Sequence, residues 1–182
     1  EVDALAAEIV RACVESFARH TPYRGGKYNL GTLAGYENAH AVFGELTGAT
    51  PEGRRAGKAF AASLGPVPGH DRSGVTAMLR SVASLPSVCL PTSTTVNINF
   101  EMALLSDEAG IDRVTGLIDG YFAAGGIELQ PTVVDPALLR EAQLHPEEYA
   151  GLTVRVAGYS ARFTTLEPEV QEEIMARTCN CA

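Results

Sequence analysis

Three groups of residues have types that could do chemistry: a basic glycine loop, a set of histidines and cysteines, and a glycine that interrupts a strand. The loop, GRRAGK from Gly53 to Lys58, has the composition of a phosphate-binding loop. It is one residue shorter than that motif, and Ala59 stands where a hydroxyl would bind magnesium. We therefore interpret it as a tight turn whose arginines form structural ion pairs. Anion binding by Arg54 and Arg55 is the weaker alternative.

The histidines and cysteines do not form a metal-binding pattern. The four histidines are far apart in the sequence, so zinc is not expected, and no metal is predicted. Cys179 and Cys181 form a close thiol pair, but two ligands do not make a site, and we expect a tail outside the fold there. Cys13 falls on the apolar face of a predicted helix, where a buried structural cysteine is expected.

The glycine that interrupts a strand is Gly158. The segment VRVAGYSARF, from Val154 to Phe163, begins with valines that alternate with other residues, as in a strand with one buried face. Glycine weakens a strand and usually marks a bulge, a bend or a close approach of another group. The segment raises the question of why a residue without a side chain is needed at this point.

The composition excludes several classes of partner. The 182 residues carry a net charge of −8 and have a pI near 5.0, which argues against nucleic acid and anionic membranes. No apolar run approaches the roughly 20 residues of a membrane span, and no basic leader precedes the first predicted helix. The four cysteines are too few for a disulfide framework in a chain of this size, so we expect a cytoplasmic protein.

Alternating helices and strands predict an α/β fold. Helices are predicted for residues 3–19, 75–84, 108–124, 136–145 and 167–178. Strands are predicted for residues 92–100, 127–135 and 152–157. Asp107 and Asp135 would cap helices, and Gly125 and Gly126 would end the helix that Asp107 begins. Pro131 would bulge its strand or confine it to an edge.

The first predicted helix has a clear apolar face. Leu5, Ile9, Cys13 or Val14, and Phe17 recur at helical spacing, so this face is expected to pack in the core. Three predicted strands cannot close a barrel or form a large sheet. Further strands are therefore expected from outside this chain.

The sequence also resembles the glycyl radical enzymes over nearly its whole length. VRVAGYSARF, with EVQEEIMART downstream, is similar to the carboxyl-terminal signature of that family. Further segments follow in the family's order and spacing: RGGKY, GATPEGRRAG, GPVPGHDRSGVTA, SVASLP, VNINF, GGIELQ and HPEEYAGLTVRVAGYSARF. The family includes pyruvate formate-lyase, the diol, choline and hydroxyproline lyases, and the aryl decarboxylases.

The resemblance implies that Gly158 stores a radical on its α-carbon. An α-carbon between an amide nitrogen and a carbonyl delocalises an unpaired electron to both sides. This requires a planar centre that a side chain would crowd, and glycine alone has no Cβ. Tyr159, Ser160 and Arg162 would support the loop by packing or hydrogen bonding.

The resemblance also implies a fold and a substrate cavity. The expected fold is the carboxyl-terminal part of a ten-stranded β/α barrel of two antiparallel five-stranded halves, with the glycine loop in the barrel centre. Residues 1–126 would form the barrel part, and residues 127–182 the glycine radical domain. The family places one strand of this chain near the cavity. The candidate residues for contact with substrate are Thr94, Thr95, Val96 and Asn97.

The family's chemistry implies partners rather than a bound cofactor. A radical S-adenosylmethionine activating enzyme with an iron–sulfur cluster removes hydrogen from the glycine, and the glycyl radical then oxidises a cysteine to a thiyl that attacks a small-molecule substrate. We do not assign that role to Cys13, because the family places its helix after the cysteine loop. Cys89 has no matching motif. The catalytic cysteine is therefore expected in an upstream polypeptide or large subunit, and the complete enzyme is expected to be a homodimer.

The expected function is thus the radical-bearing part of an anaerobic, oxygen-sensitive lyase, dehydratase, decarboxylase or formate acetyltransferase. The chain would be a fragment or a small subunit, inactive alone. The alternative is a repair or interaction module that carries the radical but has no substrate site.

Overall fold

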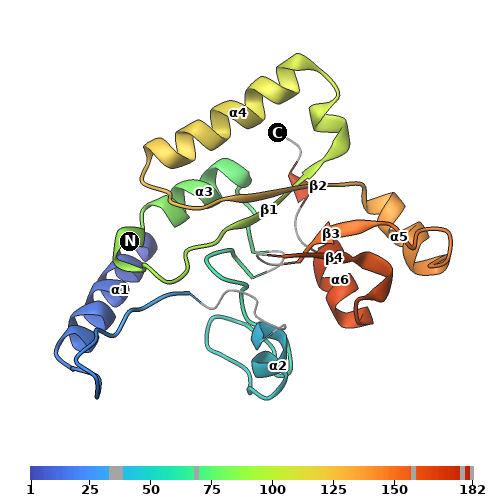
Figure 1. Cartoon of the computed structure of the whole chain (residues 1–182). Coiled ribbons are helices and arrows are strands. Elements are labelled where there is room, and N and C mark those ends of the chain that lie inside the picture. Colours follow the sequence, from blue (N-terminus) through green and yellow to red (C-terminus); the bar gives the residue numbers. More distant parts are fainter. Residues whose placement is uncertain (33–38, 68–69, 157–158, 177–178, 181–182) are drawn as a thin grey trace.

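The computed structural model describes residues 1–32, 39–67, 70–156, 159–176 and 179–180. Its α-helices are α1 (Val2–Ala18), α2 (Ala39–Glu45), α3 (Val75–Ala83), α4 (Glu108–Ala123), α5 (Pro136–Leu144) and α6 (Pro168–Ala176). Its strands are β1 (Asn97–Glu101), β2 (Gln130–Val134), β3 (Thr153–Arg155), β4 (Ser160–Arg162) and β5 (Cys179–Asn180). Short 3₁₀ helices lie at η2 (Ser87–Cys89), η3 (Met102–Leu105) and η4 (Phe163–Thr165). The predicted α/β order is confirmed (Figure 1).

The larger sheet is parallel, with strand order β2-β1-β5. β1 and β2 pair one to one, with Ile98 opposite Pro131, so the predicted bulge is wrong. Among the described strands β2 lies at the edge of its sheet, where proline is tolerated. β5 pairs with β1 through Cys179 and Asn180, so these residues are not the tail expected from the sequence. β1 itself begins later than predicted, at Asn97.

The crossover between β1 and β2 is the helix α4, and its ends are those predicted. The Asp107 side chain accepts a hydrogen bond from the Gly110 backbone N–H at 2.7 Å, which caps the first turn. At the other end, Gly125 has a φ of 105°, and the Gly126 N–H donates to the Tyr121 carbonyl at 3.0 Å. This is a Schellman motif, which glycine favours because a positive φ strains other residues. Parallel strands need such a crossover.

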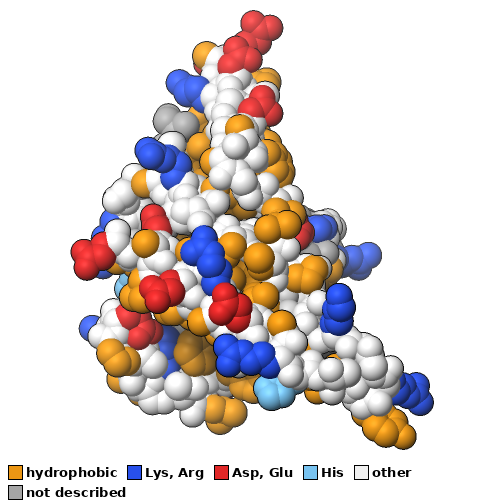
Figure 2. All heavy atoms as spheres, turned by 90° about the vertical axis from the view of Figure 1, so that its left-hand side faces the viewer, with side chains coloured by type: hydrophobic (Ala, Val, Ile, Leu, Met, Phe, Trp, Pro, Cys, Tyr) orange, Lys and Arg blue, Asp and Glu red, His pale blue; other side chains and the backbone are white. Residues whose placement is uncertain are grey.

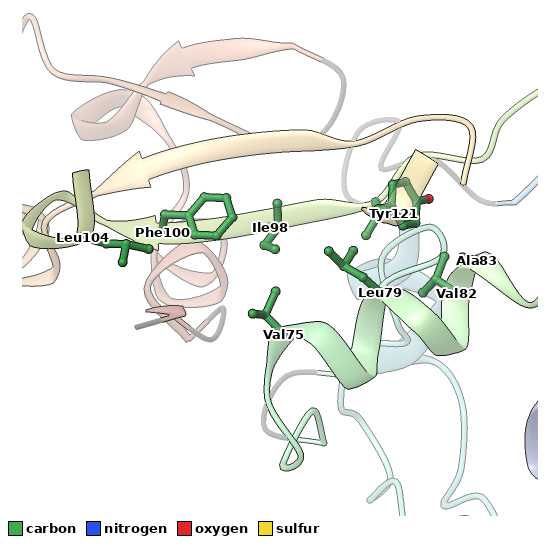
Figure 3. Close-up of a cluster of buried hydrophobic side chains, with 9 residues drawn as sticks. Val75, Leu79, Val82, Ala83, Ile98, Phe100, Leu104 and Tyr121 are labelled. Atoms are coloured by element: carbon green, nitrogen blue, oxygen red, sulfur yellow. The ribbon is translucent and has the colours of Figure 1, made fainter. Parts of the chain in front are cut away.

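The first hydrophobic core lies between α3, α4 and one face of β1. Its buried residues are Val75, Leu79, Val82, Ala83, Val96, Ile98, Phe100, Leu104 and Tyr121. In Figure 3, α3 directs Val75, Leu79 and Val82 towards the strand that carries Ile98 and Phe100. Burial of each large apolar side chain contributes about 1.5–3 kcal/mol, so this core fixes β1 through its apolar face.

A second hydrophobic core lies around the short hairpin of β3 and β4. Its buried residues are Leu139, Ala142, Val154, Val156, Phe163, Val170 and Ile174. They come from α5, β3, η4, α6 and the residue after β3, so this part of the chain has an interior of its own. The described residues form two small sheets and no closed barrel. The ten-stranded barrel and the boundary at residue 126 stay predictions.

The apolar face of α1 is not buried in this chain. The helix forms as predicted, but Leu5, Ile9 and Phe17 are 56%, 55% and 43% exposed, and Cys13 is half-buried. The prediction that this face packs in the core is wrong here. Viewed from the α1 side, the molecule shows hydrophobic side chains at its surface between charged ones (Figure 2). In the described residues, no helix combines the length and the apolar character needed to cross a membrane.

We predict that the isolated chain self-associates through this face, because its burial between copies removes apolar surface from water. Replacing Leu5 and Ile9 with Gln should lower the apparent mass in sedimentation velocity at high protein concentration. Replacing Glu8 and Arg11 with Gln is the matched control, because both are exposed on α1 and the net charge does not change. Equal association of both double variants would contradict this prediction.

Candidate functional site

The described residues on either side of Gly158 form an antiparallel pair of strands. β3 and β4 pair from Thr153 opposite Arg162 to Arg155 opposite Ser160. Beyond the last pair, the Val156 N–H donates to the Tyr159 carbonyl at 2.9 Å. Ala157 and Gly158 connect these two residues in the sequence and lie outside the described residues. The structure therefore places the flanks of Gly158 side by side.

The alternation at the start of the hairpin fixes its orientation. Val154 and Val156 are 4% and 1% exposed and point into the second core, together with the fully buried Phe163. The Phe163 N–H donates to the Leu152 carbonyl at 2.8 Å, which extends the pairing beyond β4. Since β-strands alternate sides, Arg155 must lie on the opposite face from the valines. The hairpin thus has one buried face and one polar face.

The predicted support residues are only loosely held by side-chain contacts. Tyr159 is 43% exposed, and Arg162 is exposed and contributes its backbone to the strand pairing. The Ser160 hydroxyl lies 3.5 Å from an Arg155 guanidinium nitrogen, which is a long hydrogen bond. Arg155 was not among the predicted site residues. The alternation of the valines was a signal that could have placed it on this polar face.

Arg155 connects the hairpin to the parallel sheet. Its Nε donates to the Gln130 side-chain oxygen on β2 at 3.4 Å. Gln130 pairs with Asn97 on β1 in the strand register. On the same strand, the Asn99 side chain donates to the Ile174 carbonyl of α6 at 3.4 Å. The face of the sheet opposite the first core is therefore polar and meets the hairpin and α6.

The four candidate substrate residues have different surroundings. Val96 is fully buried in the first core. Thr94 and Thr95 are also buried, and the Thr95 hydroxyl lies 3.1 Å from a carboxylate oxygen of Glu128. Neither polar atom of the Asn97 amide has a hydrogen-bond partner in the described structure, although both are buried. Asn97 thus has unused hydrogen-bonding capacity, and such a buried group costs free energy until it is paired.

The basic glycine loop is built around a buried arginine. Arg54 is 5% exposed, and its guanidinium donates to the backbone carbonyls of Gly44, Thr47, Gly48, Arg55 and Lys58. It also lies 4.5 Å from the centre of the Phe60 ring. For Arg54, contacts with backbone carbonyls take the place of the predicted ion pair. Because these carbonyls occupy the guanidinium, Arg54 is not placed for the anion binding considered in the sequence analysis.

Tyr121 and Glu52, which lie outside the hairpin, have pKa values shifted by their local surroundings. Burial raises the pKa of Tyr121, whose hydroxyl donates to the Glu128 carbonyl at 3.3 Å. A hydrogen bond from Thr50 lowers the pKa of Glu52. No group of three or more His, Cys, Asp or Glu side chains within the described ranges is placed to hold a metal ion.

The comparison with protein families decides what the hairpin belongs to. Residues 60–164 match the family described as glycine radical. The chain belongs to the glycine radical family. The matched span is more than half of the chain and contains the whole β3–β4 hairpin, together with β1 and β2. The resemblance seen in the sequence is thereby confirmed.

Named relatives agree with this assignment. Over 97% of its length, the chain is 35% identical to the PFL-like enzyme TdcE of Escherichia coli (strain K12), of which it covers 24%. The glycerol-bound B12-independent glycerol dehydratase from Clostridium butyricum is 37% identical, with a TM-score of 0.92 over the whole chain and 23% of the dehydratase. A structure of the Roseburia inulinivorans enzyme of 1,2-propanediol dehydration is 40% identical, with a TM-score of 0.89 over 98% of this chain and 21% of that one.

The chain spans about a quarter of the length of these relatives. Its structural neighbours are glycyl radical enzymes, and the chain corresponds to their carboxyl-terminal part.

We predict that Arg54→Lys lowers the free energy of unfolding by about 2 kcal/mol, since an ammonium group cannot replace a planar guanidinium among these carbonyls. Arg55→Lys is the control, because Arg55 is the adjacent residue and is exposed. Urea unfolding of both variants tests this prediction. An unchanged stability of Arg54→Lys would show that the carbonyl contacts contribute little.

Proposed function

We propose that this chain carries the radical of a glycyl radical enzyme and that Gly158 stores it. The observation that carries the proposal is the family match over residues 60–164, which includes the hairpin and its glycine. The hydrogen bond between Val156 and Tyr159 supports it, because it holds the flanks of Gly158 together. Tyr159, Ser160 and Arg162 remain proposed supports of this segment.

The chemistry requires a glycine for two reasons. A radical on the α-carbon is stabilised by the amide nitrogen on one side and the carbonyl on the other, and this delocalisation needs a planar centre. A side chain at that centre would crowd it, whereas glycine has only hydrogen there. An activating enzyme of the radical S-adenosylmethionine type would remove one hydrogen atom from Gly158. No cofactor is proposed within this chain.

The proposed radical transfer is a balanced exchange of a hydrogen atom. The glycyl radical takes a hydrogen atom from a cysteine thiol, so glycine is restored and a thiyl radical forms. The thiyl radical then takes a hydrogen atom from the substrate. Cys13 and Cys89 are half-buried on α1 and η2, and neither is proposed for this role. We assign it to a cysteine in an upstream polypeptide or a large subunit.

The proposed reaction is radical cleavage of a bond in a small molecule. Two of the matched proteins are named for dehydration of glycerol and of 1,2-propanediol, which supports loss of water from a small hydroxylated substrate. The match to a PFL-like enzyme supports acyl C–C cleavage as the second candidate. Of the proposed cavity residues 94–97, Asn97 has an amide that is unpaired in the described structure. The complete enzyme is proposed to be a cytoplasmic, oxygen-sensitive homodimer.

We predict that air cleaves the activated complete enzyme at Gly158, because a carbon radical captures O₂ and the resulting peroxyl group breaks the backbone there. Mass spectrometry after exposure to air should find two fragments that meet at this residue. Gly151→Ala is the matched control. The space around Gly151 is open and its φ is not positive, so this variant should still be cleaved at Gly158.

Gly158→Ala should stay intact under the same conditions. Cleavage of Gly158→Ala at the same position, or an intact wild-type chain after verified activation, would contradict the proposal.

A further inference from the structure

One buried contact joins two helices that are distant in the sequence. The Nε2 atom of His40, on α2, lies 2.9 Å from a carboxylate oxygen of Glu173, on α6. The two residues are 133 positions apart. The side chains are 3% and 13% exposed, so the contact is almost excluded from water. It is a hydrogen bond, and an ion pair whenever the imidazole is protonated.

The α2 side of this contact is held rigidly. The guanidinium of Arg54 donates to the Gly44 carbonyl of α2, and a Cβ at Gly44 would lie 2.3 Å from the Lys58 carbonyl oxygen. The His40 carbonyl accepts a hydrogen bond from the Phe60 N–H at 3.0 Å. The loop that Arg54 organises therefore fixes both ends of α2. The position of the His40 imidazole is therefore set by a helix, α2, that is itself held in place.

On the α6 side of this contact, the residue next to Glu173 packs against the hairpin. Ile174, the residue after Glu173, is 1% exposed and belongs to the second core with Val154 and Phe163. A displacement of Glu173 therefore also shifts Ile174, which packs in the same core as the hairpin residues. The two clusters of buried residues share no member. Apolar burial therefore holds each core together but does less to fix the position of one core relative to the other.

Two further hydrogen bonds between the two parts are longer. The hydrogen bonds of Asn99 to the Ile174 carbonyl and of Arg155 to Gln130 are each 3.4 Å long. The contact of His40 with Glu173 is shorter and involves an ionisable pair. Charge-assisted hydrogen bonds are stronger and more directional than neutral ones, so this contact is well suited to fix where α6 lies.

We propose that His40 and Glu173 are positioning residues for the radical hairpin. This inference rests on the proposed function. Hydrogen-atom transfer from a thiol to the glycyl radical needs close approach, and a misplacement of about 1 Å can cost on the order of 100-fold in rate. The pair sets the position of α6, and α6 sets that of the hairpin. The buried Nδ1 atom of His40 has no partner in the described structure, which fits a role in position rather than in net stability.

The test compares two adjacent glutamates of α6 in the activated complete enzyme. Glu173→Ala removes the contact with His40. Glu172→Ala is the matched control, because Glu172 accepts a hydrogen bond from Gln143 at 3.1 Å within the same part of the chain. His40→Ala and the double variant with Glu173→Ala complete a mutant cycle. If His40→Ala does not fold, the two glutamate variants still decide the outcome.

The first measurement is amide hydrogen exchange, followed by mass spectrometry. Glu173→Ala should raise exchange in β3, β4 and α6 by about tenfold and leave α4 unchanged, as expected for loss of a charge-assisted hydrogen bond that holds one part of the chain. Glu172→Ala should have a smaller effect. In the double variant, the effects of the two substitutions should not add, because the contact of His40 with Glu173 is lost in either single variant. Unchanged exchange, or an equal rise in α4, would overturn the proposal.

The second measurement is substrate turnover per glycyl radical, with the radical counted by electron paramagnetic resonance. Turnover per radical should fall about tenfold or more in Glu173→Ala and stay near the wild-type value in Glu172→Ala. Equal turnover per radical in the two variants would overturn the positioning role. Absence of a glycyl radical in the wild-type enzyme would instead contradict the proposed function, so the two failures are distinguishable.

Discussion

The two faces of β1 differ in chemistry, and the rest of the structure depends on that difference. One face presents Ile98 and Phe100 to α3 and α4 and is fixed by apolar burial. The other face carries Asn97 and Asn99, and Asn99 already donates to the Ile174 carbonyl of α6. A buried amide is favourable only when it is hydrogen-bonded. This face therefore favours a neighbour with polar groups at defined positions, and α6 provides one of them for Asn99, the Ile174 carbonyl.

The hairpin belongs to a part of the chain whose core of buried residues includes none from β1. Its core uses Val154 and Phe163 from the hairpin and Ile174 from α6. Its described contacts to the rest of the chain include the hydrogen bonds of His40 and Asn99 and the short pairing of β5 with β1. Hydrogen bonds are directional, so this kind of contact defines a position more sharply than it adds stability. That property suits a segment that must hold a reactive centre at one place.

Local signals in the sequence predicted the elements but not the contacts between them. Asp107 and Asp135 were expected to cap helices and do so, because capping depends only on the next few residues. The Gly158 segment was singled out because glycine broke a clear alternation. The contact of His40 with Glu173 joins residues 133 positions apart, and no local pattern encodes such a distance. The apolar face of α1 was wrongly placed in the core because periodicity shows that a face is apolar, not which surface covers it.

The most direct test of the central claim is electron paramagnetic resonance of the complete enzyme after anaerobic activation. A radical on the α-carbon of Gly158 should give a doublet from its remaining hydrogen, and the doublet should split further when glycine labelled with ¹³C at the α-carbon is incorporated. The signal should be absent from Gly158→Ala. A doublet that persists in Gly158→Ala, or no signal in the wild type with an activating enzyme proven on another substrate, would contradict the account.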